Sequence, residues 1–110
     1  MSERLAQAEC KPCAAGQPPL AEAESDRLLA MIDGWMRTGN AIAKTYRFGN
    51  YYETLAFVNA TAWISHRQDH HPDLAVGYNQ CQVVFTTHAV GGLSKNDFIC
   101  AAKMDALFAL

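Results

Sequence analysis

The stretch GNYYETLAFVNATAWISHRQD, residues 49–69, decides the layout of the fold, because it carries the clearest helical pattern in the chain. Asn50 can cap this helix, and Glu53, three residues on, fits a variant of the capping box. A repeat of 3.6 residues collects one apolar stripe, which needs a sheet or a second helix to cover it. The stripe consists of Tyr52, Ala56, Phe57, Ala60, Trp63 and Ile64. Pro72 is expected to end the helix, because the residue before a proline avoids the helical region.

Strand patterns and shorter helices lie on both sides of this helix. Residues 35–48 predict two strands around the turn TGN, and residues 74–88 predict one or two strands that end near His88. Residues 21–32 predict a helix with acids in its first turn, and the S-x-x-D signature at residues 94–97 predicts the cap of a last helix. This order of elements predicts an α+β fold with two layers, a four-stranded antiparallel sheet and helices packed on one face.

Composition excludes several classes of function. The 110 residues are 50% hydrophobic and 18% charged, and the net charge of −2 offers no basic footprint for nucleic acid. No apolar run is long enough to span a membrane, and the first residues lack the apolar stretch of a signal peptide. We therefore expect a cytoplasmic protein without nucleic-acid or membrane partners. Residues 1–20 predict a flexible N-terminal tail, because they are polar and end in GQPPL, and residues 21–110 predict the folded domain.

The four cysteines are expected to be free thiols in a reducing compartment. Cys81 and Cys100 lie in apolar contexts, where a thiol behaves as a small hydrophobe. Cys10 and Cys13 form a single C-x-x-C, which is half of the four-ligand set that a structural zinc site needs. A thioredoxin-like role is disfavoured, because no βαβ pattern follows. The alternative is a pair of exposed thiols in a flexible tail.

The histidines of the segment after the central helix raise the question of a metal. His66 and His70 are four residues apart, which is the spacing of a zinc-protease helix. That motif requires a glutamate directly after the first histidine, and here the position holds Arg67, a cation. His70 and His71 are adjacent, so they do not face the same way on a helix. We therefore predict no metal site.

Proton transfer is the other chemistry that these residues offer. Histidine titrates near neutral pH and can donate or accept a proton there. Asp69 can orient or charge the neighbouring His70, and His88 can reach the same cleft from the sheet. The chain has no nucleophile elbow, phosphate loop or dinucleotide fingerprint. The residues alone leave this hypothesis and an ordinary structural role about equally open.

Two motifs in the second half of the chain carry a resemblance to a known family. They are DHHPDLAVGYN, residues 69–79, and TTHAVGGLSKND, residues 86–97. This double motif closely resembles the pterin-4a-carbinolamine dehydratase family. The matching residues are His70, His71, Pro72, Tyr78, Asn79, Thr87, His88, Gly92, Leu93, Ser94 and Asp97. The resemblance covers about residues 22–108 and leaves Cys10 and Cys13 outside.

The resemblance implies a hydro-lyase that works without a metal or a cofactor. Such an enzyme dehydrates 4a-hydroxytetrahydropterin to quinonoid dihydropterin and recycles the pterin that aromatic amino acid hydroxylases use. It implies His70, His71 and His88 as catalytic residues, with His70 and His88 as the acid/base pair and His71 orienting the pterin. The substrate-binding residues that it implies are Asp69, His70, His71, Thr86, Thr87, His88 and Ala89. It also implies the same α+β fold, and a homodimer or homotetramer.

Supporting roles and other functions stay open. Some members of the family carry a glutamate where this chain has His66, so His66 replaces a supporting acid or has no role. Asp97 caps the last helix alone or also supports the site. A protein-interaction module is one alternative function, since some animal relatives stabilise a dimeric transcription factor. A pterin-binding protein linked to molybdopterin metabolism is another, since the same pocket could hold a different pterin.

Overall fold

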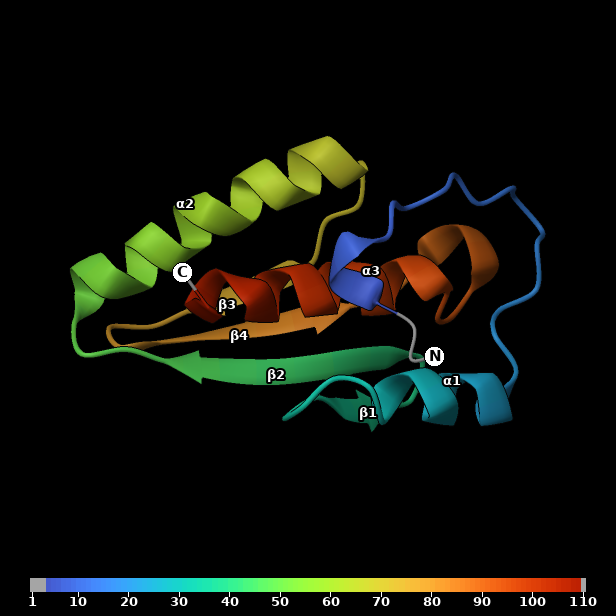
Figure 1. Cartoon of the computed structure of the whole chain (residues 1–110), viewed down its shortest axis with the longest axis horizontal. Helices are drawn as coiled ribbons and strands as arrows, with labels where there is room; N and C mark the ends of the chain where they lie inside the picture. Colours follow the sequence, from blue (N-terminus) through green and yellow to red (C-terminus); the bar gives the residue numbers. More distant parts are fainter. Residues whose placement is uncertain (1–3, 110) are drawn as a thin grey trace.

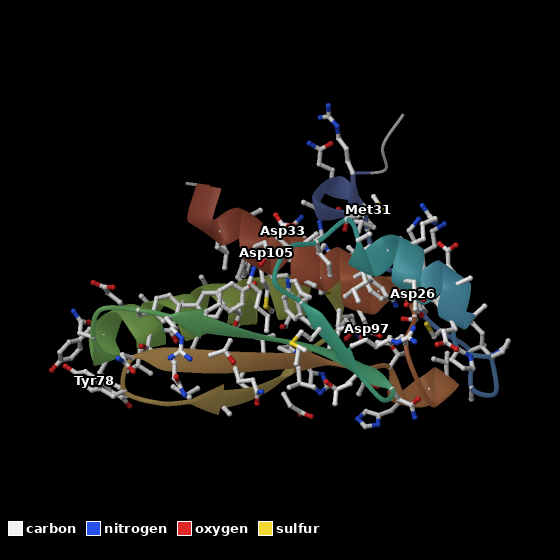
Figure 2. The ribbon with its side chains drawn as sticks, turned by 90° about the horizontal axis from the view of Figure 1, so that it is seen from below. Asp26, Met31, Asp33, Tyr78, Asp97 and Asp105 are labelled. Carbon is white, nitrogen blue, oxygen red and sulfur yellow. The ribbon has the colours of Figure 1, made fainter. Side chains whose placement is uncertain are left out.

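The computed structural model describes residues 4–109, and within them it confirms the predicted two-layer α+β fold (Figure 1). Residues 1–3 and 110, at the limits of the predicted tail and domain, lie outside the described residues. The helices and strands are α1 (Glu22–Leu29), β1 (Met36–Thr38), β2 (Ala41–Arg47), α2 (Tyr51–Gln68), β3 (Asp73–Val76), β4 (Gln80–Phe85) and α3 (Lys95–Asp105). Three short 3-10 helices are added to them: η1 (Leu5–Gln7), η2 (His88–Val90) and η3 (Ala106–Ala109). Figures 1 and 2 show the α-helices on one face of the sheet.

The sheet is antiparallel throughout, with the strand order β1-β2-β4-β3. Its central pair sets Ile42 opposite Phe85 and Tyr46 opposite Cys81. These four side chains are buried beneath the helices, as the alternation of residues in β4 predicts. β2 and β4 therefore supply these buried core residues of the sheet. The candidate site lies at the end of the sheet where β4 ends.

The prediction that His88 ends a strand is wrong. β4 ends at Phe85, and His88 begins the 3-10 helix η2. The chain leaves the sheet because the backbones of Thr87 and Gly92 pair with each other, with Thr87 N–H 2.8 Å from the Gly92 carbonyl. Gly91 closes the loop with a positive φ of 67°, a conformation that glycine adopts without a steric penalty. His88 is thus placed on a tight loop after the strand.

The helix α2 begins where the sequence predicts and ends by a different device. Asn50 Oδ1 accepts a hydrogen bond of 2.9 Å from the Glu53 N–H, which confirms the N-cap. At the other end, Asp69 takes the left-handed conformation, with φ 51° and ψ 43°. The backbone N–H groups of Asp69 and His70 both donate to the Ser65 carbonyl, a left-handed termination of the kind common at helix ends. Asp69, rather than Pro72, therefore ends α2.

The predicted apolar stripe of α2 is wrong in part. Tyr52 is 80% exposed and Trp63 is 62% exposed, although Phe57 is buried. The buried face consists of Thr54, Phe57 and Thr61. The two threonines can lie in the core because their hydroxyls donate to backbone carbonyls, at 2.9 Å from Thr54 to Asn50 and 2.7 Å from Thr61 to Val58. A stripe counted from apolar residues alone cannot include them.

Residues 4–20 make specific contacts with the rest of the chain. Leu5 belongs to the hydrophobic core, and the ammonium group of Lys103 donates a hydrogen bond of 2.8 Å to the Ala6 carbonyl. The segment then passes the end of α2 and the first turn of α3 on its way to α1 (Figure 1). The division at residue 20 stays a prediction, but these contacts place the segment against α3. No helix within residues 4–109 has both the length and the apolar character to cross a bilayer.

Candidate active site

A cavity of about 480 Å³ lies where the end of α2, the end of β4, the loop of η2 and the first turn of α3 meet. Its volume falls in the range that holds small organic ligands. All seven residues that the sequence implies for substrate binding line it, namely Asp69, His70, His71, Thr86, Thr87, His88 and Ala89. Folding therefore brings the His-His-Pro motif and the Thr-His motif to one place.

His70, which lines the cavity, forms a short polar contact with Asp97. Nε2 of His70 lies 2.6 Å from Oδ1 of Asp97, and the side chain of Asp97 is fully buried. The His70 ring stacks on Phe85, with the ring centroids 5.7 Å apart and the planes 12° apart. A carboxylate on one imidazole nitrogen fixes the tautomer and the orientation of the ring. With Nε2 held by Asp97, Nδ1 is the nitrogen of His70 that remains for proton exchange.

The buried carboxylate of Asp97 is held by three donors. Besides Nε2 of His70, the Thr87 hydroxyl donates to it over 2.8 Å and the Ser94 N–H over 3.0 Å. The Thr87 hydroxyl has one hydrogen, so in its 2.8 Å contact with the Ser94 hydroxyl the serine must be the donor. This network offsets the cost of burying a charge. Asp97 therefore caps α3, as predicted, and at the same time fixes His70.

The surroundings of His70 favour its protonated form. Burial of the ring lowers the pKa of His70, but the hydrogen bond and the negative charge of Asp97 oppose burial. Smaller contributions from Cys10 and Asp69 act in the same direction as Asp97, and the pKa of His70 lies above its ordinary value. An imidazole with a raised pKa can hold a proton at neutral pH and deliver it to a ligand.

The other histidines differ in their placement. His71 and His88 line the cavity from the segment after α2 and from η2, and both are exposed. His66 is not among the lining residues; it lies on the exposed side of α2, with its ring 5.7 Å from the ring of Trp63. Thr86 is anchored to the turn between β1 and β2, because its hydroxyl donates a hydrogen bond of 2.6 Å to the Asn40 carbonyl. The site thus combines one anchored histidine with two accessible ones.

Sequence reasoning missed a whole wall of the cavity. The additional lining residues are Cys10, Lys11, Pro12, Cys13, Arg67, Gln68, Asp73, Val84 and Asn96. Residues 10–13 come from the predicted tail, and no local periodicity ties them to a site more than 50 positions away. The C-x-x-C and its proline were the one signal that this segment could be ordered.

The described residues offer no ready-made cluster of metal ligands. Within residues 4–109, no three histidine, cysteine, aspartate or glutamate side chains converge in a way that could hold an ion. The Cys10–Cys13 pair therefore lacks the partners of a four-ligand zinc site in the arrangement that the structure gives.

Comparison with known proteins agrees with the motifs. The family model described as pterin 4 alpha carbinolamine dehydratase matches residues 18–107. A protein of Nitrosospira multiformis, provisionally named pterin-4-alpha-carbinolamine dehydratase, is 62% identical and covers 94% of this chain and 92% of its own. A protein of Stenotrophomonas maltophilia with the same provisional name is 56% identical over 94% of this chain and 90% of its own.

Solved structures share the fold. A transcriptional coactivator/pterin dehydratase from Brucella melitensis superposes with a TM-score of 0.78 at 30% identity, covering 81% of this chain and 97% of that one. A pterin dehydratase-like protein identified as a RuBisCO assembly factor in the alpha-carboxysome gives a TM-score of 0.55 at 26% identity, covering 66% and 84%. From the family match, the close relatives and the shared fold, this chain belongs to the pterin-4-alpha-carbinolamine dehydratase family.

Proposed function

We propose that this protein dehydrates 4a-hydroxytetrahydropterin to quinonoid dihydropterin and thereby returns the pterin to an aromatic amino acid hydroxylase. The observation that carries the proposal is the pairing of His70 with the buried Asp97 at a cavity that His71 and His88 also line. Membership of the family supports the same activity. A reaction that only moves protons and releases water is the chemistry that three imidazoles can perform.

The elimination needs two proton transfers. The hydroxyl on C4a leaves as water after it receives a proton, and the proton on N5 departs while the C4a–N5 double bond forms. His70 would be the donor, because its hydrogen bond to Asp97 and the charge of Asp97 raise its pKa. His88 lies across the loop of the same cavity and would accept the N5 proton. Both histidines return to their starting protonation states by exchange with solvent, so the cycle closes without a metal or a cofactor.

Binding falls to the remaining residues of the cavity. His71 would bind and orient the pterin ring, next to His70 and on the same segment. Asp69, Thr86, Thr87 and Ala89 would line the ring with side-chain and backbone groups. Asp97 is a positioning residue, since it acts on the substrate only through His70.

A coupled assay tests the proposal. The decay of enzymatically generated 4a-hydroxytetrahydropterin would be followed by ultraviolet absorbance in the presence of a chelator. Wild type is expected to accelerate the decay, and His70→Ala and His88→Ala should each lose about 100-fold or more in kcat. Circular dichroism of each variant controls for folding. No acceleration by wild type, or full activity in both variants, would contradict the mechanism.

A protein-binding role is the second candidate, favoured by the likeness to a dehydratase-like assembly factor. In that case a partner protein would bind whether or not His70, His71 and His88 are present. This role would be supported if the wild type had no dehydratase activity and a variant with alanine at all three positions still bound the partner. The homodimer or homotetramer, the cytoplasmic location and the link to a hydroxylase stay predictions, and light scattering of the purified chain tests the first of them.

A further inference from the structure

Residues 9–13, here called the strap, are clamped between two helices, and residues 10–13 form one wall of the cavity. Gln68, the last residue of α2, accepts a hydrogen bond of 2.8 Å from the Cys10 N–H and donates one of 2.8 Å to the Glu9 carboxylate. Asn96, in the first turn of α3, accepts from the Lys11 N–H over 3.0 Å and donates to the Lys11 carbonyl over 2.7 Å. Each side-chain amide accepts one hydrogen bond and donates another, so the two amides fix the position of the strap.

A thiol of this strap meets a thiol of α3. Sγ of Cys10 lies 3.5 Å from Sγ of Cys100, although the residues are 90 positions apart. Cys100 is completely buried on α3, whereas Cys10 is half-buried and lines the cavity. A disulfide has a sulfur–sulfur distance of about 2.05 Å, so the two atoms need to approach by only about 1.5 Å.

The charges around the pair distinguish the two thiols. The hydrogen bond from Cys100 lowers the pKa of Cys10, and the nearby His70 and Lys103 reinforce it, whereas burial and the charge of Asp97 oppose it. The same hydrogen bond and burial raise the pKa of Cys100. The accessible thiol therefore ionises first, and the buried thiol remains protonated behind it. Redox-sensitive cysteines commonly have this arrangement of an accessible thiolate and a neighbouring resolving thiol.

We propose that Cys10 and Cys100 form a reversible thiol–disulfide pair that ties the strap to α3 and restricts access to the cavity. The short distance between the two sulfurs supports the pairing. The position of residues 10–13 in the wall of the cavity supports the effect on access. Cys13 has a different environment, since its sulfur lies 3.7 Å from the Asn96 amide nitrogen and 4.0 Å from the Lys11 carbonyl. The pair thus consists of one cysteine of the C-x-x-C and one cysteine of the core.

The oxidant is hydrogen peroxide. The Cys10 thiolate attacks one peroxide oxygen, the O–O bond breaks, and the products are a sulfenic acid and hydroxide, which takes a proton to become water. Cys100 then loses its proton and its sulfur attacks the sulfur of the sulfenic acid, which releases the second water. Two thiols and one peroxide give one disulfide and two waters. A dithiol reductant reverses the change by thiol exchange.

The reduced and the oxidised strap differ in how they can move. In the reduced protein the strap is held by the hydrogen bonds of Gln68 and Asn96, which can open and close. In the oxidised protein a covalent bond joins residue 10 to the helix that also carries Asp97. Because residues 10–13 line the cavity, we expect slower exchange of ligands after oxidation.

Peptide mapping tests the pairing directly and requires no enzymatic activity. Reduced wild-type protein would be treated with a slight excess of hydrogen peroxide, alkylated, digested without reductant and analysed by mass spectrometry. We expect a cross-link between the peptides of Cys10 and Cys100 that dithiothreitol removes. Cys10→Ser and Cys100→Ala should abolish it, and Cys13→Ser should retain it. A cross-link between Cys10 and Cys13, or oxidised Cys10 without any cross-link, would overturn the proposal.

Two further readouts test the effect on the strap. Amide hydrogen exchange at residues 9–13 should slow at least threefold on oxidation and recover with dithiothreitol. Turnover of the proposed substrate should fall at least threefold in parallel, and not in Cys10→Ser treated in the same way. Unchanged exchange, or unchanged turnover in a fully cross-linked active protein, would overturn the restriction of access. A protein without dehydratase activity would refute the proposed function alone, since mapping and exchange still decide the redox pair.

Discussion

Nε2 of His70 lies 2.6 Å from Oδ1 of Asp97, across 27 positions of sequence. The contact joins the segment that follows α2 to the first turn of α3, over the end of the strand β4. The orientation of His70 therefore depends on how α2 and α3 pack against the sheet. Figure 2 shows Asp97 toward one end of the sheet and Tyr78 at the other, so the site lies far from the β3–β4 turn.

Replacing Asp97 with asparagine should impair both activity and stability. All three partners of the carboxylate are donors, so the NH2 group of the substituted amide would have to face one of them. We expect kcat to fall about 10- to 100-fold, as for other groups that orient a functional histidine. Unfolding free energy should fall by about 1–3 kcal/mol. Coupled assays and urea denaturation measure the two losses.

The pH profile separates positioning from folding in this variant. Without the charge of Asp97, only the smaller contributions of Cys10 and Asp69 oppose burial, so the pKa of His70 falls. The activity that needs protonated His70 should therefore shift to lower pH. Ser94→Ala is the matched control, because it weakens the cap of α3 by about 1 kcal/mol and leaves the carboxylate in place. The same shift in Ser94→Ala would contradict the role of Asp97 on His70.

Stability should depend on pH through His70. Its pKa in the folded protein is raised, so the folded state binds the proton more tightly than the unfolded state does. The added stability is complete below the unfolded pKa of about 6.5 and disappears as the pH rises through the raised folded pKa. The difference in unfolding free energy between wild type and His70→Gln should thus decrease by about 1 kcal/mol from acidic to alkaline pH. A difference that stays constant, or grows with pH, would rule out a charged His70–Asp97 pair.

Removing a clamp should weaken substrate binding more than it slows the chemistry. Asn96→Ala deletes both hydrogen bonds to Lys11, and the strap loses one of its two side-chain amide partners, Asn96, and keeps Gln68. A hydrogen bond contributes about 1 kcal/mol, so KM should rise about fivefold while kcat changes less. Asn59→Ala, the same replacement on an exposed position of α2, should leave KM unchanged. A fall of about fivefold in kcat with an unchanged KM would contradict the prediction that this wall of the cavity contributes to substrate binding.

Asp105, at the far end of α3, should matter for stability alone. It accepts hydrogen bonds from Trp35 Nε1 at 3.0 Å, from Lys44 Nζ at 2.8 Å and from the Tyr46 hydroxyl. Asp105→Ala leaves these donors without their shared acceptor and should cost about 1–3 kcal/mol of unfolding free energy. Activity per folded molecule should stay within about twofold, because Asp105 is about 12 Å along the helix from Asp97. A large loss of kcat with unchanged stability would contradict this separation.

The sequence predicted what local chemistry controls. The Asn50 cap, the strand alternation that buries Cys81 and Phe85, and the capping box of Ser94 follow from backbone hydrogen bonds and side-chain periods, and the structure has them. The buried face of α2 was misjudged because Thr61 satisfies its hydroxyl within the helix. A count of apolar side chains treats such a threonine as polar.

Long-range contacts explain the other differences. The sequence placed His88 on a strand because the alternation continues past Phe85, and only the pairing of Thr87 with Gly92 turns the chain away. The wall of the cavity formed by residues 10–13 rests on partners 58 to 90 positions away. Such contacts leave no periodic signal in either partner. The motifs located the histidines, whereas the strap required three-dimensional packing.

Asp97 unites two demands that evolution and protein engineering usually meet with different residues. Functional groups commonly cost stability, so a library screened for robust expression tends to discard them and a library screened for turnover tolerates weaker folds. Here one carboxylate serves both the start of α3 and the orientation of His70. A deep mutational scan would therefore rank position 97 as intolerant by abundance and by turnover alike. Neither ranking by itself would reveal why, and stabilising replacements elsewhere in the chain could restore the abundance of a variant without restoring its chemistry.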